Sequence, residues 1–192
     1  MCIYKAFGGD FLRVIAGDLR SLPLETPKGD NTRPTLDRVK ETLFNILQDK
    51  LYDIRFLDLF SGSGGIGIEA ISRGAKESFF IENNKEAIKC IENNIKKTKT
   101  ENKAHLIKGD VFTTIPSLSG VFDIVFMDPP YGNEYEKKAL KLLVDNKKVN
   151  EDTIIIVEAD LKTDFSYLTE YGLKLDREKK YKTSRHLFIS LI

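Results

Sequence analysis

Short apolar runs alternate with helical periodicity from residue 55 to residue 157, and this order constrains the fold more than any other feature. The apolar runs predict strands at 56–60, 78–81, 104–107, 122–127 and 153–157. Helical patterns fall between them, at 66–73, 85–97 and 134–147. Strands that alternate with helices form βαβ units, so the chain is predicted to build a mostly parallel α/β sheet. The runs at 173–182 and 186–192 have no helix between them and predict a terminal antiparallel hairpin.

The residues before this alternation predict a small N-terminal element. A short strand at 12–16, the turn signal Gly17-Asp18 and a second run at 22–25 predict a β-hairpin. Thr35 is the expected cap of a helix that runs to about Gln48. We therefore expect an N-terminal extension and hairpin at 1–34, followed by the main domain at 35–192.

Composition excludes several classes of protein. The 192 residues are 41% hydrophobic and 31% charged, which is typical of a globular domain with a full core. A net charge of +1 gives no overall basic field, so any nucleic acid must be bound by local patches. Two cysteines and two histidines form no metal-like cluster, and His105 and His186 are interpreted as plain surface or strand residues. No signal peptide or membrane-length apolar run is visible, so we expect a cytoplasmic protein without a membrane partner.

A glycine-rich loop follows the first strand of the alternation and opens a helix. Gly62, Gly64 and Gly67 fit the pattern G-x-G-x-x-G, in which glycines let the backbone bend sharply and approach a ligand. Glu82 lies about 20 residues further on, at the end of the second strand, where a carboxylate can accept both hydroxyls of a ribose. On these residues alone, an NAD-dependent oxidoreductase remains possible.

Polar residues at the other strand ends favour S-adenosylmethionine as the cofactor. Asp58 and Ser61 begin the glycine loop, where an amino acid moiety can bind. Asp110 ends the third strand and is suited to receive an adenine amino group beside an aromatic ring. The residues expected to bind the cofactor are Asp58, Phe60, Ser61, Gly62, Gly64, Gly67, Glu82, Asn83, Asp110 and Val111.

The fourth strand runs directly into Asp128-Pro129-Pro130-Tyr131. Two prolines fix the backbone and remove two N–H donors, so this corner is rigid and rich in hydrogen-bond acceptors. A planar amino group carries two N–H donors and matches such a corner, while the ring of Tyr131 can lie against a base. We predict that these four residues are catalytic and act on the exocyclic amine of a nucleobase.

Each motif alone has a structural explanation: a glycine pattern can serve helix packing, and Asp-Pro-Pro can be a turn. Their order is more specific. The glycine loop, Glu82, Asp110 and Asp128 fall at the ends of four successive predicted strands. In a parallel sheet those ends share one edge, which is where ligands bind in open α/β folds.

These residues resemble a known family. Residues 32–47 (TRPTLDRVKETLFNIL), 57–64 (LDLFSGSG) and 128–131 (DPPY) are similar to the bacterial RsmD-type 16S ribosomal RNA guanine-N2 methyltransferases, and the resemblance runs from about Leu12 to the C-terminus. It implies a Rossmann-like class I methyltransferase with a seven-stranded sheet. It also implies S-adenosylmethionine as donor and a guanosine of small-subunit rRNA, or of the assembling small subunit, as acceptor.

The residues themselves leave alternatives open. An adenine-N6 methyltransferase acting on DNA or RNA would use the same acceptor corner, and a non-catalytic RNA-binding module would keep only the fold. No metal is expected, because the sulfonium already makes the methyl group electrophilic, and we expect a monomer. Phosphate contacts are predicted for the basic residues of the N-terminal part, which with Tyr131 would bind the substrate: Arg13, Arg20, Lys28, Arg33, Arg38 and Lys40.

Overall fold

A seven-stranded sheet organises the protein, and the computed structural model describes residues 12–27 and 34–192 of it. The strands lie in the order β3-β2-β1-β4-β5-β7-β6. Their bounds are β1 Arg55–Leu59, β2 Glu77–Glu82, β3 Ala104–Lys108, β4 Ile124–Met127, β5 Ile154–Asp160, β6 Leu173–Lys180 and β7 Ser184–Leu191. Strands β1 to β5 run parallel, and β7 pairs antiparallel with both β5 and β6. The predicted α/β sheet with a C-terminal antiparallel hairpin is therefore confirmed.

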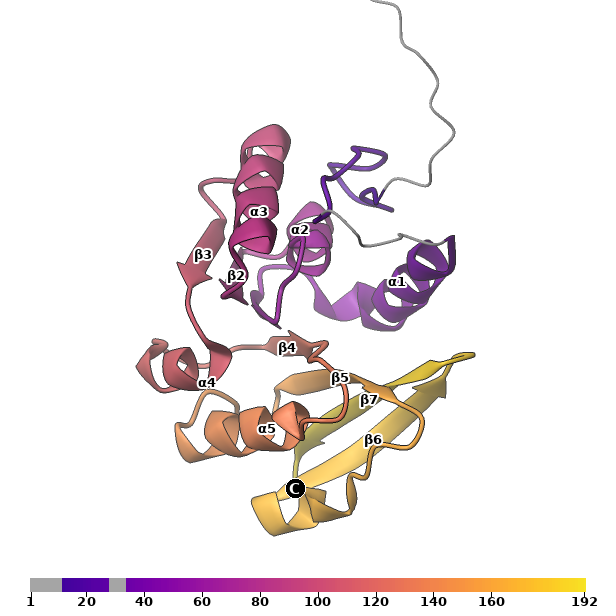
Figure 1. The fold of residues 1–192 in the computed structure, drawn as a ribbon, viewed down its shortest axis with the longest axis vertical. Coiled ribbons are helices and arrows are strands. Elements are labelled where there is room, and N and C mark those ends of the chain that lie inside the picture. Colours follow the sequence, from indigo (N-terminus) through magenta and orange to yellow (C-terminus); the bar gives the residue numbers. More distant parts are fainter. Residues whose placement is uncertain (1–11, 28–33) are drawn as a thin grey trace, which may run out of the picture.

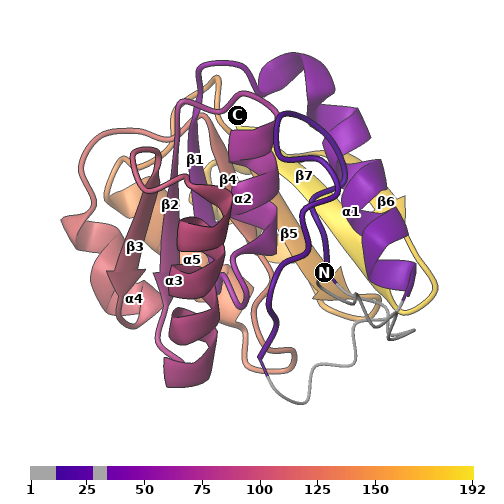
Figure 2. The same ribbon diagram turned by 90° about the horizontal axis from the view of Figure 1, so that it is seen from above.

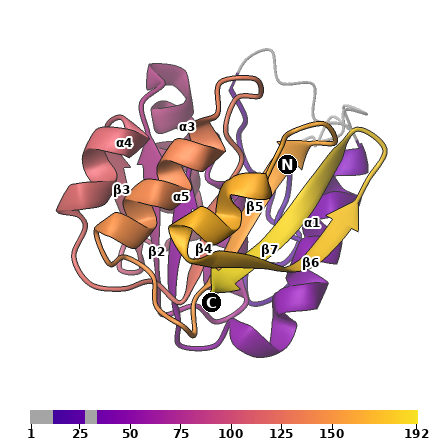
Figure 3. The same cartoon turned by 90° about the horizontal axis from the view of Figure 1, so that it is seen from below.

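Helices cover both faces of this sheet (Figure 1). One face carries α1 Pro34–Leu47, α2 Gly65–Ser72 and α3 Lys85–Thr98. The other carries α4 Val111–Thr114 and α5 Tyr135–Asp145, together with the 3-10 turns η2 Ile115–Ser117 and η3 Ser166–Tyr171 (Figure 3). A further 3-10 turn, η1 Gln48–Lys50, continues α1. None of the helices in the described ranges is both long and apolar enough to cross a membrane.

Alternation along the strands divides the core into two layers. Phe126 and Ile124 of β4 pack with Leu43 and Phe44 of α1, whereas Val125 and its neighbours on the same face pack with α5. Successive side chains of a strand point to opposite faces, so parity along each strand decides which helices a residue meets. This rule places the side chains of Asp58 and Glu158 on the α1 and α2 face.

The N-terminal segment packs against α2 and α3. Val14 and Leu24 are buried in a cluster with Ile68 and Ile71 of α2 and with Ile91 of α3. Figure 2 shows residues 12–27 crossing over α2 and passing beside α1. The two arms of the predicted hairpin are joined by three backbone hydrogen bonds around one antiparallel bridge between Arg13 and Pro23. They form no longer ladder, because the backbone N–H groups of Ile15 and Ala16 bond to Glu69 of α2.

Local differences from the sequence-based expectations have simple causes. The first helix begins at Pro34, so Thr35 lies inside its first turn and is not its cap. Proline is favoured in that turn, because its missing N–H has no intrahelical partner there. Helix α4 was not expected, since four residues are too few to show a period.

Candidate active site

Asp58, Asp128 and Glu158 gather at the carboxyl ends of the parallel strands β1, β4 and β5, beside His186 near the start of the antiparallel strand β7. Asp58 of β1 is in register with Phe126 of β4, and Glu158 of β5 is paired directly with His186 of β7. Asp128 follows the pair formed by Met127 and Val157, so it stands beside Glu158. The predicted cofactor loop after β1 and the predicted acceptor corner after β4 are thus on the same edge of adjacent strands.

The carboxylate of Glu82 holds the glycine loop through hydrogen bonds from the backbone. Glu82 accepts hydrogen bonds from the backbone of Gly62 at 2.8 Å, of Asn83 at 2.9 Å and of Asn84 at 2.8 Å. Gly62 has φ +55°, and a side chain at this position would point into open space. The loop is therefore fixed by Glu82 while its outer surface stays open to a ligand.

Asp58 lies beneath the loop and is fully buried. Its Oδ2 accepts a hydrogen bond from the backbone N–H of Gly67 at 3.1 Å, at the start of α2. Burial raises the pKa of Asp58 well above its usual range, with smaller contributions from the charges of Glu82 and Asp128, although the Gly67 bond opposes the rise. The charges of Glu82 and Asp128 thus both act on Asp58, and a positively charged ligand would relieve this repulsion.

The Cα of Gly67 faces the protein interior and not the open side of the loop. A Cβ there would lie 2.3 Å from Cε1 of Phe80 and 2.6 Å from Oγ of Ser78. The glycine lets α2 pack closely on β2, which is one of the roles that glycines have in this kind of loop. Ser61 is also occupied within the protein, because its hydroxyl donates to the carbonyl of Asp58 at 2.7 Å.

The third strand ends in a capped helix beside an aromatic cluster. Oδ1 of Asp110 accepts from the backbone N–H groups of Phe112 and Thr113, which starts α4 at Val111. The rings of Phe60 and Tyr135 are stacked at a centroid distance of 6.2 Å, and Phe112 meets both edge-on. This cluster closes the α5 side of the cofactor loop, where Phe60 was predicted to contribute.

The acceptor corner combines a crowded carboxylate with an open aromatic ring. Desolvation by the surrounding protein and then the charge of Glu158 raise the pKa of Asp128 to about 8. By its accessible surface, however, Asp128 is an exposed residue, so solvent moderates the rise in its pKa without changing the direction. Pro129 is buried, Pro130 is exposed and Tyr131 is 48% exposed, so its ring is available to a flat partner.

A polar chain next to Asp128 was not predicted from the sequence. Glu158 accepts from Oγ of Ser184 at 3.1 Å and contacts Nε2 of His186 at 3.0 Å. The hydroxyl of Tyr181 lies 3.2 Å from Nδ1 of the same histidine. Because a carboxylate only accepts, the imidazole proton belongs on Nε2, and Nδ1 then accepts from the tyrosine. His186 lies in a strand as expected, but it is buried and joined to this chain.

A cavity of about 140 Å³ connects these groups. It lies between α1, the start of α2 and the sheet. Its walls are mostly apolar, and the polar residues Asp128, Glu158 and His186 stand together among its lining, with Lys40 of α1 also present. The apolar part is formed by Leu12, Val39, Leu43, Gly65, Ile66 and Phe126. Apolar walls with a few convergent polar groups are the usual composition of a small-molecule or base pocket.

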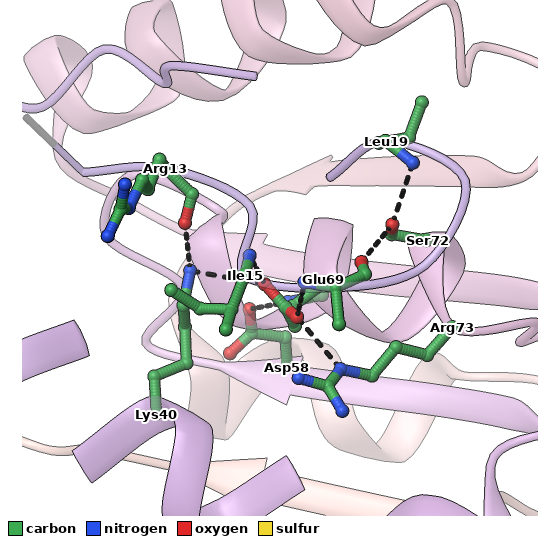
Figure 4. A network of polar contacts seen from close by, with 10 residues as sticks. Arg13, Ile15, Leu19, Lys40, Asp58, Glu69, Ser72 and Arg73 are labelled. Carbon is green, nitrogen blue, oxygen red and sulfur yellow. Dashed lines mark hydrogen bonds and ion pairs between the residues drawn. The ribbon is translucent and has the colours of Figure 1, made fainter. Parts of the chain in front are cut away.

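A buried ionic network centred on Glu69 adjoins the cavity through Lys40, and Figure 4 shows its contacts. Glu69 of α2 is fully buried and accepts from the backbone of Ile15 at 2.7 Å and of Ala16 at 3.0 Å. Its carboxylate also lies 3.3 Å from Nζ of Lys40 and 2.8 Å from Nε of Arg73. Lys40 therefore links α1 to α2, and its predicted contact with phosphate is wrong because it is 5% exposed.

The other basic residues occupy different places. Arg13 and Arg38 are exposed, and each is next in sequence to a residue that lines the cavity: Arg13 follows Leu12, and Arg38 precedes Val39. Arg20 is also exposed, but its turn is bonded to Ser72 at the far end of α2, about 10 Å along the helix from Gly65. Lys28 and Arg33 lie outside the described residues.

The site fits a cationic nucleoside donor. Asp58, Glu82 and Asp128 surround an open glycine turn, and carboxylates are suited to ribose hydroxyls, an amino group and a sulfonium. Oε2 of Glu82 makes one backbone bond, so it can accept another. Across residues 12–27 and 34–192, no group of three or more His, Cys, Asp or Glu side chains is arranged to hold a metal ion.

Sheet order and site together define a Rossmann-like class I methyltransferase architecture. Residues 12–190 match the family model described as Conserved hypothetical protein 95, and the chain belongs to this family, which is the RsmD-type family indicated by its motifs. It is 36% identical over 152 residues to the ribosomal RNA small subunit methyltransferase D of Haemophilus influenzae, covering 78% of this chain and 79% of that protein. The protein of the same name from Escherichia coli is 33% identical over 154 residues, covering 80% and 77%.

Solved structures agree with this placement. The structure of yhhF from Escherichia coli, a protein assigned to the methyltransferases, superposes with a TM-score of 0.82 at 29% identity. The superposition covers 95% of this chain and 98% of that one. The similarity therefore includes the N-terminal segment and the terminal hairpin as well as the central sheet.

Proposed function

We propose that the protein transfers a methyl group from S-adenosylmethionine to the exocyclic N2 of a guanosine in small-subunit rRNA. One observation carries the proposal: the open glycine turn after β1 and the Asp128 corner after β4 stand on adjacent strands at one edge of the sheet. A donor held over the first would lie beside an amine held at the second. The names of the relatives, which specify small-subunit rRNA, supply the class of substrate.

The cofactor would be held by the residues at the first three strand ends. Glu82 would accept ribose hydroxyls while keeping Gly62 in place, and Asp110 would accept the adenine amino group through the oxygen that does not cap α4. Asp58 would fix the start of α2 from below. When bound, S-adenosylmethionine supplies an electrophilic methyl group, because its sulfur carries a positive charge.

The Asp128 corner would prepare the acceptor. The lone pair of a guanine amine is delocalised into the ring, so the amine is a poor nucleophile. Asp128 and the carbonyl of Pro129 would accept its two N–H groups and favour a nitrogen whose lone pair points outward. Tyr131 would stack on the extruded base. Holding both reactants in this arrangement can supply about 7–11 kcal/mol of the barrier.

Asp128 would also receive the proton that leaves N2 as the new N–C bond forms. A carboxylate whose pKa is raised toward neutrality is a stronger base than an ordinary aspartate. The charge of a bound sulfonium would lower this pKa and favour the ionised form that accepts hydrogen bonds. Asp128 is thus suited to hold the amine first and to accept its proton afterwards.

Nucleoside analysis tests the proposal. Small-subunit rRNA from cells that lack the gene should lose one N2-methylguanosine, and the wild-type gene should restore it. Loss of N6-methyladenosine instead would identify the adenine enzyme that the acceptor corner alone also permits. Calorimetry provides the second control: S-adenosylhomocysteine should bind and NAD should not, whereas the reverse would support an oxidoreductase.

A further inference from the structure

Two carboxylates stand side by side at the acceptor end of the cavity, and only one of them is needed to hold an amine. Asp128 and Glu158 follow paired residues of β4 and β5, and both line the cavity. Ser184 and His186 each contact a different oxygen of Glu158, at 3.1 Å and 3.0 Å, so its orientation is fixed from two sides. A side chain held in this way is prepared for a ligand rather than free to turn away.

Nucleobases differ in what lies next to the exocyclic amine. In guanine, N2 is flanked on one side by N1–H, which is a second donor, and on the other by N3, which is an acceptor. In adenine, N6 is flanked by N1 and N7, which are both acceptors, and in cytosine the neighbouring ring nitrogen is again an acceptor. A second carboxylate on the N1 side of the bound amine therefore attracts guanine and repels the other two bases.

We propose that Glu158 accepts the N1–H of the target guanine and so selects guanine over adenine at this site. Each carboxylate oxygen has room for more than one hydrogen bond, so the contacts to Ser184 and His186 leave Glu158 able to bind the base. The apolar walls formed by Val39, Ile66 and Phe126 would enclose the ring, and the exposed Arg13 and Arg38 adjoin the lining residues Leu12 and Val39. This inference rests on the proposed function, because it assumes an amine held at Asp128.

His186 and Tyr181 act as positioning residues in this scheme. With the imidazole proton on Nε2, His186 donates to Glu158 and Tyr181 donates to Nδ1. Burial, and then the charge of Glu158, raises the pKa of Tyr181 to about 12, so its hydroxyl keeps the proton that it donates. The chain from Tyr181 to Glu158 thus maintains a carboxylate that only accepts, as recognition of N1–H requires.

The test removes the two partners of the proposed hydrogen bond one at a time: the N1–H donor of the base, and the carboxylate acceptor of Glu158. The position of the lost N2-methylguanosine is first mapped in the rRNA, and small subunits are then reconstituted with 16S rRNA that carries either guanosine or 2-aminopurine at that position. The analogue keeps the amine at C2 but has an unprotonated N1. For the wild-type protein, kcat/KM should be about 10- to 100-fold lower with 2-aminopurine, since a hydrogen bond to a charged group is lost and Glu158 faces a lone pair.

Glu158→Gln should lower kcat/KM for guanosine at least about 10-fold and bring the preference for guanosine over 2-aminopurine close to one. The comparison between the two proteins cancels the intrinsic reactivity of the two amines. Glu178→Gln is the matched control, because Glu178 lies on β6, in the hairpin that carries Ser184 and His186, but pairs with Arg185 outside the cavity. It should keep the wild-type preference.

An unchanged preference in Glu158→Gln would overturn the inference while leaving guanine methylation intact. Absence of N2-methylguanosine from the wild-type reaction would instead refute the proposed function. Should Glu158→Gln fail to bind S-adenosylhomocysteine, Glu158→Asp provides the second variant, since it keeps the charge and should retain part of the preference.

Discussion

Nζ of Lys40 lies 3.3 Å from Oε2 of Glu69, and both side chains are buried, with exposed fractions of 5% and 0%. The same carboxylate accepts backbone hydrogen bonds from Ile15 and Ala16 and pairs with Arg73. One charged group of α2 therefore fixes α1 and the N-terminal segment, which together form the wall of the cavity opposite the sheet. The shape of the site depends on a buried charge that takes no part in the chemistry.

Glu69→Gln should destabilise the protein strongly. It removes the carboxylate from a buried lysine and a half-buried arginine, and breaking such a pair costs about 3–5 kcal/mol. For a chain of this size each kcal/mol lowers Tm by about 2–4 °C, so calorimetry should show a fall of at least about 6 °C. Lys40→Met should cost less, because Glu69 keeps Arg73 and its two backbone donors. Glu92→Gln, which breaks an exposed pair with Lys108, is the control and should change Tm little. An equal fall in Tm for Glu69→Gln and Glu92→Gln would contradict the argument.

Asp128→Ala should reduce kcat about 10²- to 10⁴-fold, the range for loss of a positioned acid or base. Binding of S-adenosylhomocysteine should change little, because the predicted cofactor contacts lie at the other strand ends. The measurement is methyl transfer from labelled S-adenosylmethionine to small subunits that lack the modification. Asp145→Ala, an exposed aspartate of α5, is the control and should keep full activity. Normal turnover by Asp128→Ala would remove this residue from the mechanism.

The raised pKa of Asp128 predicts a pH-dependent change in stability. The folded protein resists ionisation of this group, so the stability present at low pH is lost as pH rises from about 4, the ordinary pKa of aspartate. The loss should be complete above the folded pKa of about 8. Asp128→Asn cannot ionise and should therefore unfold at a higher temperature than the wild type at pH 8. In thermal scans, the difference in Tm between Asp128→Asn and the wild type should shrink steadily toward pH 4. A difference in Tm that stays constant with pH would show that the charge of Asp128 is not its cause.

Placement of the arginines predicts unequal roles in RNA binding. Arg13→Glu and Arg38→Glu should weaken RNA binding, since both residues are exposed and adjoin residues that line the cavity, while Arg20→Glu at the far end of α2 should have a smaller effect. Each lost phosphate contact should reduce the slope of log K against log salt by about 0.7–0.9. Filter binding at several salt concentrations measures this, with S-adenosylhomocysteine affinity as the folding control. A parallel loss of both affinities would indicate misfolding.

The sequence predicted the sheet well because its strands are strongly apolar and end in turn residues. Phe56, Phe80 and Val125 lie in the predicted strands, and the acceptor corner follows β4 as expected. Residues at strand ends could be assigned to one edge because parallel strands share a direction. The same reasoning extended to the fifth predicted strand would have found Glu158, which follows it directly.

Other features needed the three-dimensional structure. His186 meets Glu158 only through the register of an antiparallel pair, and no spacing in the sequence specifies that register. Lys40 and Glu69 lie on different helices, and a charged residue in an amphipathic helix is normally exposed. Gly67 fits a ligand-binding pattern in the sequence, yet its Cα faces Phe80.

Methyl transfer by the purified protein tests the central claim most directly. Small subunits from cells lacking the gene are incubated with labelled S-adenosylmethionine, and the digested nucleosides are separated by mass spectrometry. The account predicts one labelled product, N2-methylguanosine, formed by the wild type and nearly absent with Asp128→Ala. Label in N6-methyladenosine, or equal product from the two proteins, would contradict the assignment of the Asp128 corner to guanine N2.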